Sequence, residues 1–107
     1  MNVIIEENKY IEKFLKQHNE YSEKLKDEIY SDINTMINEK AYKIKDVRGL
    51  KYRGKTAFEY KIILDKYFVC RIAYIKEDDN IVVFYISTNI IKANFTKEVS
   101  SLKGVTK

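Results

Sequence analysis

The spacing of the apolar residues changes near residue 41, and this change constrains the fold more than any other feature of the sequence. Before it, apolar residues recur every three or four positions, as they do on one face of a helix. After it, apolar and polar residues alternate, as they do along a strand with one buried face. A helical part followed by a run of strands indicates an α+β fold.

The part before residue 41 is predicted to hold a short strand and two helices. Val3–Ile5 is the expected strand, and Asn8 is placed to cap a helix whose apolar side includes Ile11 and Phe14. We expect the chain to reverse at residues 17–20, so that the two helices form an antiparallel hairpin. The second helix is indicated by Tyr21, Leu25, Ile29, Ile33, Met36 and Ile37.

Four further strands are expected after residue 41. Consecutive hairpins would make the sheet antiparallel, and the order β-α-α-β-β-β-β would pack the helical hairpin on one face. Residues 93–102 are expected to form at most two helical turns, and a chain of 107 residues fits one domain, 1–107. The expected strands lie within Tyr42–Tyr52, Phe58–Leu64, Tyr67–Ile75 and Ile81–Ser87, with a turn at Asp65-Lys66.

The usual catalytic and metal-binding residue sets are missing. His18 is the only histidine and Cys70 the only cysteine, which excludes a disulfide within the chain and a structural zinc site. A Cys-His pair or a Ser-His-Asp triad would need His18 itself, so neither is expected. We expect His18 to be a structural residue of the helical hairpin and Cys70 to be a small core residue. The acidic run Glu77–Asp79 is interpreted as a solvated turn. No metal or other cofactor is expected.

The chain is also expected to act away from membranes. No apolar run approaches the roughly 18 residues of a membrane span. The sequence turns acidic directly after Ile5, without a basic stretch or a small-residue cleavage site before it. A cytoplasmic location is therefore predicted.

Positive charge is concentrated in the middle third of the chain. Residues 1–40 carry six basic and nine acidic side chains, a net charge of −3. Residues 41–76 carry ten basic and three acidic side chains, a net charge of +7, and residues 77–107 are neutral. The overall charge of +4 therefore conceals a strongly basic segment.

This basic segment is interleaved with tyrosines, which is typical of surfaces that bind RNA. Lysine and arginine neutralise phosphates, and exposed aromatic rings stack on unpaired bases. Lys51, Arg53 and Lys55 alternate, so an extended chain would place all three on one side. Lysine and tyrosine also furnish the solvent face of many sheets, and composition alone leaves this alternative open.

Arg71 is the most distinctive basic residue, because it interrupts an apolar, β-forming run of nine residues. It shares a face with Ala73 and Ile75, opposite Cys70 and Ile72. A guanidinium held beside a strand suits the recognition of a phosphate or the stabilisation of a phosphorane. It would equally suit an inward-pointing charge or an ion pair with Glu59.

The segment from Leu50 to Lys92 resembles the RelE/ParE superfamily of toxins from bacterial toxin–antitoxin modules. The similarity lies in the basic stretch LKYRGK, the strand EYKIIL and the run CRIAYIKEDDNIVVFYI. The order β-α-α-β-β-β-β agrees with this family. The resemblance implies a RelE-like endoribonuclease that cleaves mRNA, in some members only on the ribosome, and that an acidic antitoxin protein neutralises.

The implied reaction is attack of the 2′-OH on the adjacent phosphate, assisted by Lys, Arg and Tyr side chains in place of histidines. The resemblance assigns Arg71 to the phosphate charge and Lys61 to a neighbouring strand position, and it places Lys92 beyond the last strand. Tyr85 is the candidate for the missing C-terminal acid or base. The full candidate set is Arg71, Lys61, Lys92 and Tyr85 as catalytic residues and Lys51, Arg53, Lys55, Tyr60 and Asn89 as RNA-binding residues.

Some positions depart from the family pattern. Ile63 and Asp65 stand where RelE-type ribonucleases have further basic residues, and residues 90–96 contain neither Arg nor Tyr. Two alternatives therefore stay open. One is a ParE-like toxin that inhibits gyrase without cleaving RNA, and the other is a non-cleaving module of bacterial or phage origin that binds RNA or protein.

Overall fold

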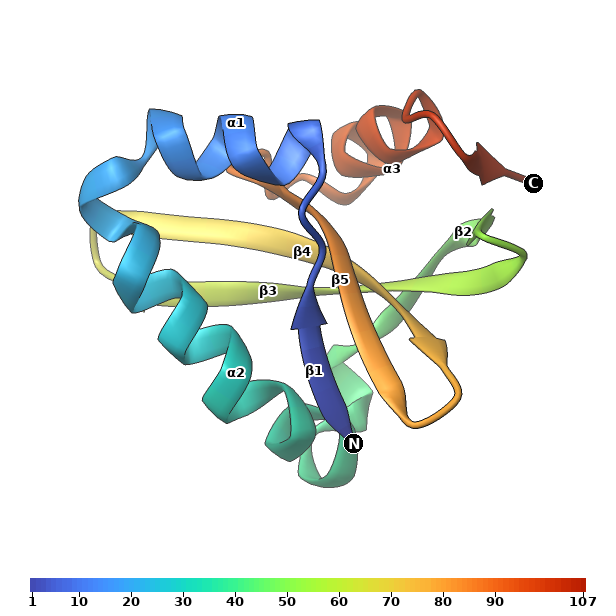
Figure 1. Ribbon diagram of the computed structural model, residues 1–107, viewed down its shortest axis with the longest axis horizontal. Coiled ribbons are helices and arrows are strands. Elements are labelled where there is room, and N and C mark those ends of the chain that lie inside the picture. Colours follow the sequence, from blue (N-terminus) through green and yellow to red (C-terminus); the bar gives the residue numbers. More distant parts are fainter.

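The computed structural model describes residues 1–107 and confirms the α+β class (Figure 1). Two 3₁₀ turns, η1 (Asn19–Tyr21) and η2 (Ala41–Lys43), flank the second helix. The elements in chain order are β1 (Asn2–Ile5), α1 (Lys9–Gln17), α2 (Ser22–Glu39), β2 (Lys45–Tyr52), β3 (Lys55–Asp65), β4 (Phe68–Glu77), β5 (Asn80–Ser87), α3 (Lys92–Ser100) and β6 (Val105–Thr106).

The strands form one mixed sheet in the order β1-β5-β4-β3-β2-β6. The strands β2 to β5 are antiparallel, as their short connections require. The prediction of a wholly antiparallel sheet is wrong at β1, which pairs in parallel with β5, with Val3 opposite Ile81. The two helices between β1 and β2 give the chain enough length to return to the starting end of the sheet, so β1 is free to lie parallel.

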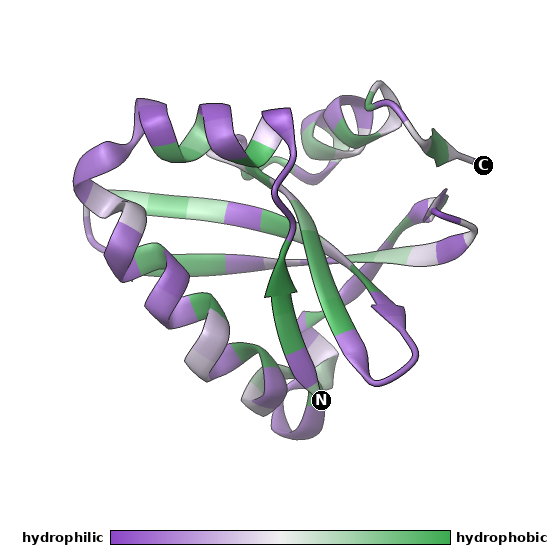
Figure 2. Ribbon diagram, viewed as in Figure 1, coloured by the Kyte–Doolittle hydropathy of each residue, from purple (hydrophilic) through white to green (hydrophobic).

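The larger apolar cluster lies between the sheet and the helices α1 and α2. Figure 2 shows the apolar sides of both helices turned toward the strands and their polar sides turned outward. Asn8 caps α1 as predicted, because its side chain accepts hydrogen bonds from the N–H groups of Tyr10 and Ile11. The main buried residues are Ile11, Phe14, Leu25, Ile29, Ile33 and Met36 from the helices and Tyr60, Ile62, Cys70, Ile72, Tyr74 and Val83 from the sheet.

The two helices do not pack side by side as a hairpin. They meet at η1 and diverge from it across the sheet (Figure 1). Each helix uses its apolar side against the strands, Phe14 in α1 and Ile29 in α2 for example. Neither helix therefore has an apolar side left for the other.

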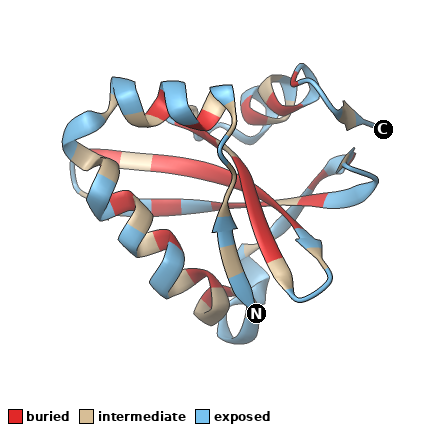
Figure 3. Cartoon of the chain, in the orientation of Figure 1, coloured by how far each residue is buried: buried red, intermediate tan, exposed pale blue.

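A smaller apolar cluster lies on the opposite face of the sheet, under α3. The helix contributes Phe95 and Val99, and Leu102 follows it. Because β4 and β5 are covered by apolar residues on both faces, they are buried along most of their length (Figure 3). The strand residues of this cluster are Val47, Leu50, Ala57, Ala73, Ile75, Val82 and Phe84.

The turns between strands follow local chemistry. Arg53 and Gly54 both have positive φ, which matches a two-residue type I′ turn between β2 and β3. The turn between β3 and β4 lies at Lys66–Tyr67, one residue later than predicted, and Asp65 stabilises it by accepting a hydrogen bond from the N–H of Tyr67. None of the helices is both long and apolar enough to cross a bilayer.

Candidate functional site

A basic groove of about 410 Å³ lies on the sheet face that α1 and α2 leave uncovered. Alternation along the strands explains its position. Tyr60 and Ile62 point into the helical layer, so Lys61 between them points the other way. The residues that line the groove are Tyr42, Lys43, Lys45, Lys61, Ile63, Arg71 and Lys92.

Four lysines supply the free positive charge of this basic groove. Lys43, Lys45, Lys61 and Lys92 are all exposed, and none of them forms an ion pair. They come from η2, the start of β2, the middle of β3 and the start of α3. Like charges brought this close repel one another, so the groove favours an anionic occupant.

Arg71 lies at the base of the groove and is only 7% exposed. All three nitrogens of its guanidinium already donate hydrogen bonds. Nη1 donates to Oε1 of Glu59 at 2.7 Å, and Nε and Nη2 donate to the carbonyl oxygen of Ile90 at 3.2 and 2.9 Å. The ion pair with Glu59, one of the alternatives drawn from the sequence, is therefore present.

The partner of Arg71 is buried as well. Glu59 is 2% exposed, and it lies two residues before Lys61 on the same side of β3. Burial raises the pKa of its carboxyl, while the positive charges of Arg71 and Lys92 oppose that rise. The carboxyl of Glu59 therefore balances a charge that would otherwise be buried without compensation.

The connection between β5 and α3 borders the groove and is held by polar contacts. Asn89 donates from its side chain to Glu98 at 2.9 Å, and its backbone N–H donates to the hydroxyl of Ser87. The hydroxyl of Tyr85 donates to the other carboxylate oxygen of Glu98 at 2.8 Å. Burial would raise the pKa of Glu98, but hydrogen bonding from the side chains of Ser87, Tyr85 and Asn89 outweighs burial, and the pKa lies below its usual value.

Tyr85 and Asn89 are thus placed differently from Lys61 and Arg71. Neither residue lines the basic groove, and Tyr85 borders a separate cavity of about 240 Å³ beside α1. Burial and the hydrogen bond to Glu98 raise the pKa of Tyr85. Both residues hold the β5–α3 connection to α3.

Tyr60, which was predicted to bind RNA, lies in the apolar core and not in the basic groove. Its ring is 1% exposed and packs edge-to-face against Tyr74 under α2, where no base can stack on it. Burial raises the pKa of its phenol. The alternation of β3 already places Tyr60 on the apolar side, and only the tyrosine content of the segment suggested otherwise.

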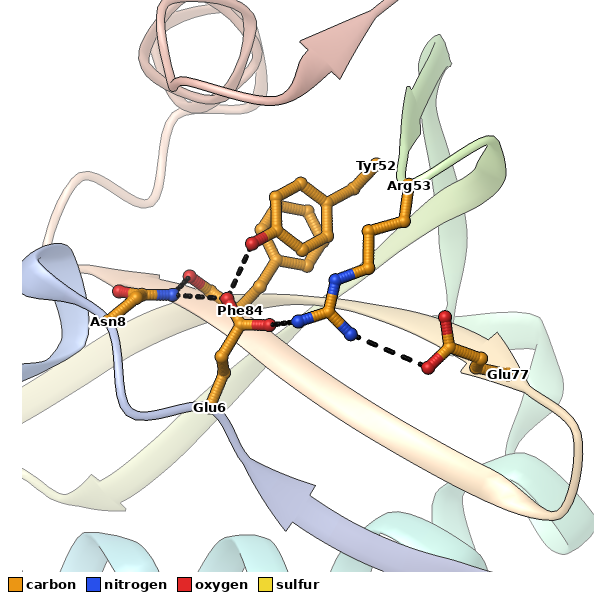
Figure 4. A network of polar contacts seen from close by, with 6 residues as sticks. All are labelled: Glu6, Asn8, Tyr52, Arg53, Glu77 and Phe84. Atoms are coloured by element: carbon orange, nitrogen blue, oxygen red, sulfur yellow. Dashed lines mark hydrogen bonds and ion pairs between the residues drawn. The ribbon is translucent and has the colours of Figure 1, made fainter.

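Lys51, Arg53 and Lys55 lie at the tip of the β2–β3 hairpin, away from the groove-lining residues. Figure 4 shows why Arg53 is not a free cation: its guanidinium forms ion pairs with Glu6 and, at 3.4 Å, with Glu77.

The same contacts tie the hairpin tip to the N-terminal segment. The hydroxyl of Tyr52 donates to Glu6, and the Tyr52 ring stacks on Phe84 of β5 with 4.2 Å between centroids (Figure 4). Asn8 completes the network by donating to Glu6 and to the carbonyl oxygen of Phe84.

His18 and Cys70, the only histidine and the only cysteine, lie outside the basic groove, and His18 borders the cavity beside α1. The ring of His18 packs against Phe14 and Phe68 at the end of α1. Cys70 is fully buried, and burial raises the pKa of its thiol to about 12. Neither residue borders the basic groove.

Three groove residues belong to the basic, tyrosine-rich segment but are absent from the candidate RNA-binding residues predicted from the sequence. Tyr42, Lys43 and Lys45 lie in or directly after the 3₁₀ turn η2, which has no clear sequence signature. Tyr42 is 71% exposed and is the one aromatic side chain in the groove. The charge excess of residues 41–76 was the available signal, because both lysines belong to it.

The comparisons with known proteins add no relative: no protein-family model matches the chain, and no curated protein or solved structure is significantly similar to it.

Proposed function

We propose that the chain is an RNA-binding toxin of the RelE/ParE type, and that single-stranded RNA lies in the basic groove with its phosphates against Lys43, Lys45, Lys61 and Lys92. The observation that carries this proposal is the convergence of four unpaired lysines and one exposed tyrosine in a single groove. Lysines neutralise backbone phosphates, and the ring of Tyr42 offers a surface on which a base can stack.

The proposed reaction is endonucleolytic cleavage of mRNA, on or off the ribosome. The 2′-oxygen forms a bond to phosphorus, and the bond from phosphorus to the 5′-oxygen breaks. The products are a 2′,3′-cyclic phosphate and a 5′-hydroxyl: the 2′-OH loses its proton to solvent water, the 5′-oxygen gains one from a lysine, and water reprotonates that lysine. The ammonium groups of Lys61 and Lys92 would stabilise the charge on the phosphorane and protonate the leaving oxygen. An acidic antitoxin segment would compete for the same groove.

Induced expression followed by mapping of RNA 5′ ends tests this proposal. We expect growth arrest and new 5′-hydroxyl ends, both lost in Lys61→Ala and in Lys92→Ala. Lys97→Ala is the matched control, because Lys97 is an exposed lysine of the same helix α3 outside the groove. Purified protein that neither binds nor cuts RNA, with and without ribosomes, would contradict the proposal.

A specific observation favours a second candidate, a toxin or module that binds without cleaving. Arg71 and Tyr85, two of the four candidate catalytic residues, already have intramolecular partners. Such a protein would bind RNA with a strong dependence on salt and leave it intact. A ParE-like member would instead block DNA supercoiling by gyrase. Cleavage and supercoiling assays on the same preparation separate these activities.

A further inference from the structure

We propose that Arg71 is a positioning residue, which fixes Lys92 at the basic groove by holding the carbonyl group of Ile90, and that it does not bind phosphate itself. The inference rests on the proposed RNA-binding function of the groove. It assigns Arg71 a different part in that function from direct contact with the substrate.

The first argument is the occupancy of the guanidinium. Recognition of a phosphate by arginine uses two parallel N–H donors along one edge of the group. In Arg71 the edge formed by Nε and Nη2 is directed at the carbonyl oxygen of Ile90, and Nη1 is directed at Glu59. Because the side chain is also buried, a phosphate in the groove meets the exposed lysines first.

The second argument is the nature of the connection that Arg71 holds. Residues 88–91 join β5 to α3, and Ile90 and Ile91 are 39% and 61% exposed. Apolar burial therefore does little to fix this segment, and polar contacts must do so. Asn89 is held by Glu98, Ile90 is held by Arg71, and Lys92 follows two residues later as the first residue of α3.

The third argument is the balance of charge. Arg71 lies directly opposite Lys61 across β3 and β4, where two free cations would repel each other. The ion pair with Glu59 neutralises Arg71, so it holds the connection without raising the repulsion among the groove lysines. No uncharged side chain of this length carries two N–H groups along one edge. This explains why an arginine occupies the position.

The test uses a double variant that removes the ion pair and the hydrogen bonds of Arg71 without changing the net charge of the protein. In E59L/R71M both partners are replaced by apolar side chains of similar size, so no buried charge is left alone. Binding of a short fluorescent 2′-O-methyl oligonucleotide, which the proposed 2′-OH reaction cannot cleave, is measured across a salt series. Each phosphate contact contributes a slope of about 0.7 to the plot of log affinity against log salt. Heteronuclear NOE values of residues 89–92 report the mobility of the connection.

We expect the NOE values of residues 89–92 to fall in E59L/R71M, while those of the Lys66–Tyr67 turn stay unchanged. The salt slope should fall by about 0.7, as it does in Lys92→Ala, and adding Lys92→Ala to the double variant should change it no further. If Arg71 binds phosphate itself, the triple variant (E59L/R71M with Lys92→Ala) loses one phosphate contact more than E59L/R71M does. Its salt slope then falls further, by about 0.7. That result, or unchanged NOE values, overturns the proposal.

Two further measurements keep the test decisive. Should E59L/R71M not fold, Arg71→Lys keeps the charge opposite Glu59 but cannot direct two donors at Ile90, and it should mobilise residues 89–92 in the same way. A wild-type protein that does not bind the oligonucleotide would refute the proposed function. The NOE values would still decide whether Arg71 positions the connection.

Discussion

Lys61 and Arg71 face each other across β3 and β4, yet their environments are opposite. Lys61 is exposed in the basic groove, whereas Arg71 is buried beneath it against Glu59 and the carbonyl oxygen of Ile90. The forked guanidinium of Arg71 directs one N–H group at Glu59 and two at the carbonyl oxygen of Ile90, a fixed geometry that a compact ammonium group does not have. Lys61 therefore keeps a free charge at the surface, whereas the charge of Arg71 is balanced by Glu59.

Among the residues at the basic groove, substitution of one member of the Glu59–Arg71 ion pair should lower the free energy of unfolding the most. Replacing Glu59 with Ala leaves a buried guanidinium without its carboxylate, and we expect a loss of roughly 3–5 kcal/mol in the free energy of unfolding. The double variant E59L/R71M should lose far less, because both charges leave together. Urea denaturation followed by circular dichroism measures both values. Equal losses in the two variants would show that the charges are not coupled.

Arg53 should contribute little to RNA binding despite lying in the most basic stretch of the sequence. Its charge is already balanced by Glu6 and Glu77. In Arg53→Asn the turn keeps a residue that tolerates positive φ, so stability should change by no more than about 1 kcal/mol. RNA affinity should change less than about twofold, against about tenfold for Lys61→Ala. Fluorescence anisotropy with the same oligonucleotide compares them, and equal losses would place Arg53 in the binding surface.

The fold should lose stability steeply above pH 10. Burial raises the pKa of Tyr74 from 10.0 to about 12 and also raises that of Tyr60, and both rings are 1% exposed. Above pH 10 these phenols ionise in the unfolded chain but stay protonated in the folded one, so unfolding releases protons and the free energy of unfolding falls. Each contributes a slope of about −1.4 kcal/mol per pH unit up to its folded pKa.

Tyrosinate absorbance and circular dichroism, recorded together during an alkaline titration, test this expectation. The absorbance of the buried phenols should rise only as the far-ultraviolet signal is lost. In Tyr74→Phe the alkaline transition should become less steep. Full ionisation of all nine tyrosines in a chain that remains folded would contradict the prediction that burial keeps Tyr60 and Tyr74 protonated.

Asn8 should be the most sensitive polar residue of the N-terminal segment. It caps α1 and also donates to Glu6 and to the carbonyl oxygen of Phe84. Asn8→Ala should cost about 1–2 kcal/mol for the cap alone, with a further loss for the carbonyl left without its donor. Asn34→Ala is the control, since Asn34 makes one exposed contact, to the carbonyl oxygen of Met1, and should change stability by less than about 0.5 kcal/mol. Thermal or urea unfolding compares the two.

The sequence predicted those features that depend on neighbours along the chain. Alternation placed Cys70 and Ile72 on the helical side of β4 and Arg71 on the other, and Asn8 was identified as a cap from the helical spacing that follows it. These features need only the period of the apolar residues and one local hydrogen bond.

The remaining features depend on residues that are distant in sequence. The parallel pairing of β1 with β5 joins residues 2–5 to residues 80–83, and no local pattern encodes it. The contacts from Arg71 to Ile90 and from Tyr85 to Glu98 depend on where α3 packs, and the sequence indicated one or two helical turns in residues 93–102 without indicating where they pack. The basic segment could therefore be identified from the sequence. Which of its cations are free and which form ion pairs or hydrogen bonds could not.

The pairing of β1 with β5 also affects how the protein is made. Asn2 lies opposite Asn80, so β1 has no partner strand until β5 has left the ribosome. Pairing between strands this far apart in sequence is slow compared with the formation of a helix or a hairpin. Lys92 and the connection that positions it are synthesised later still. The basic groove therefore cannot be complete until Lys92 has been synthesised, and by then β1 to β5 are already present in the chain.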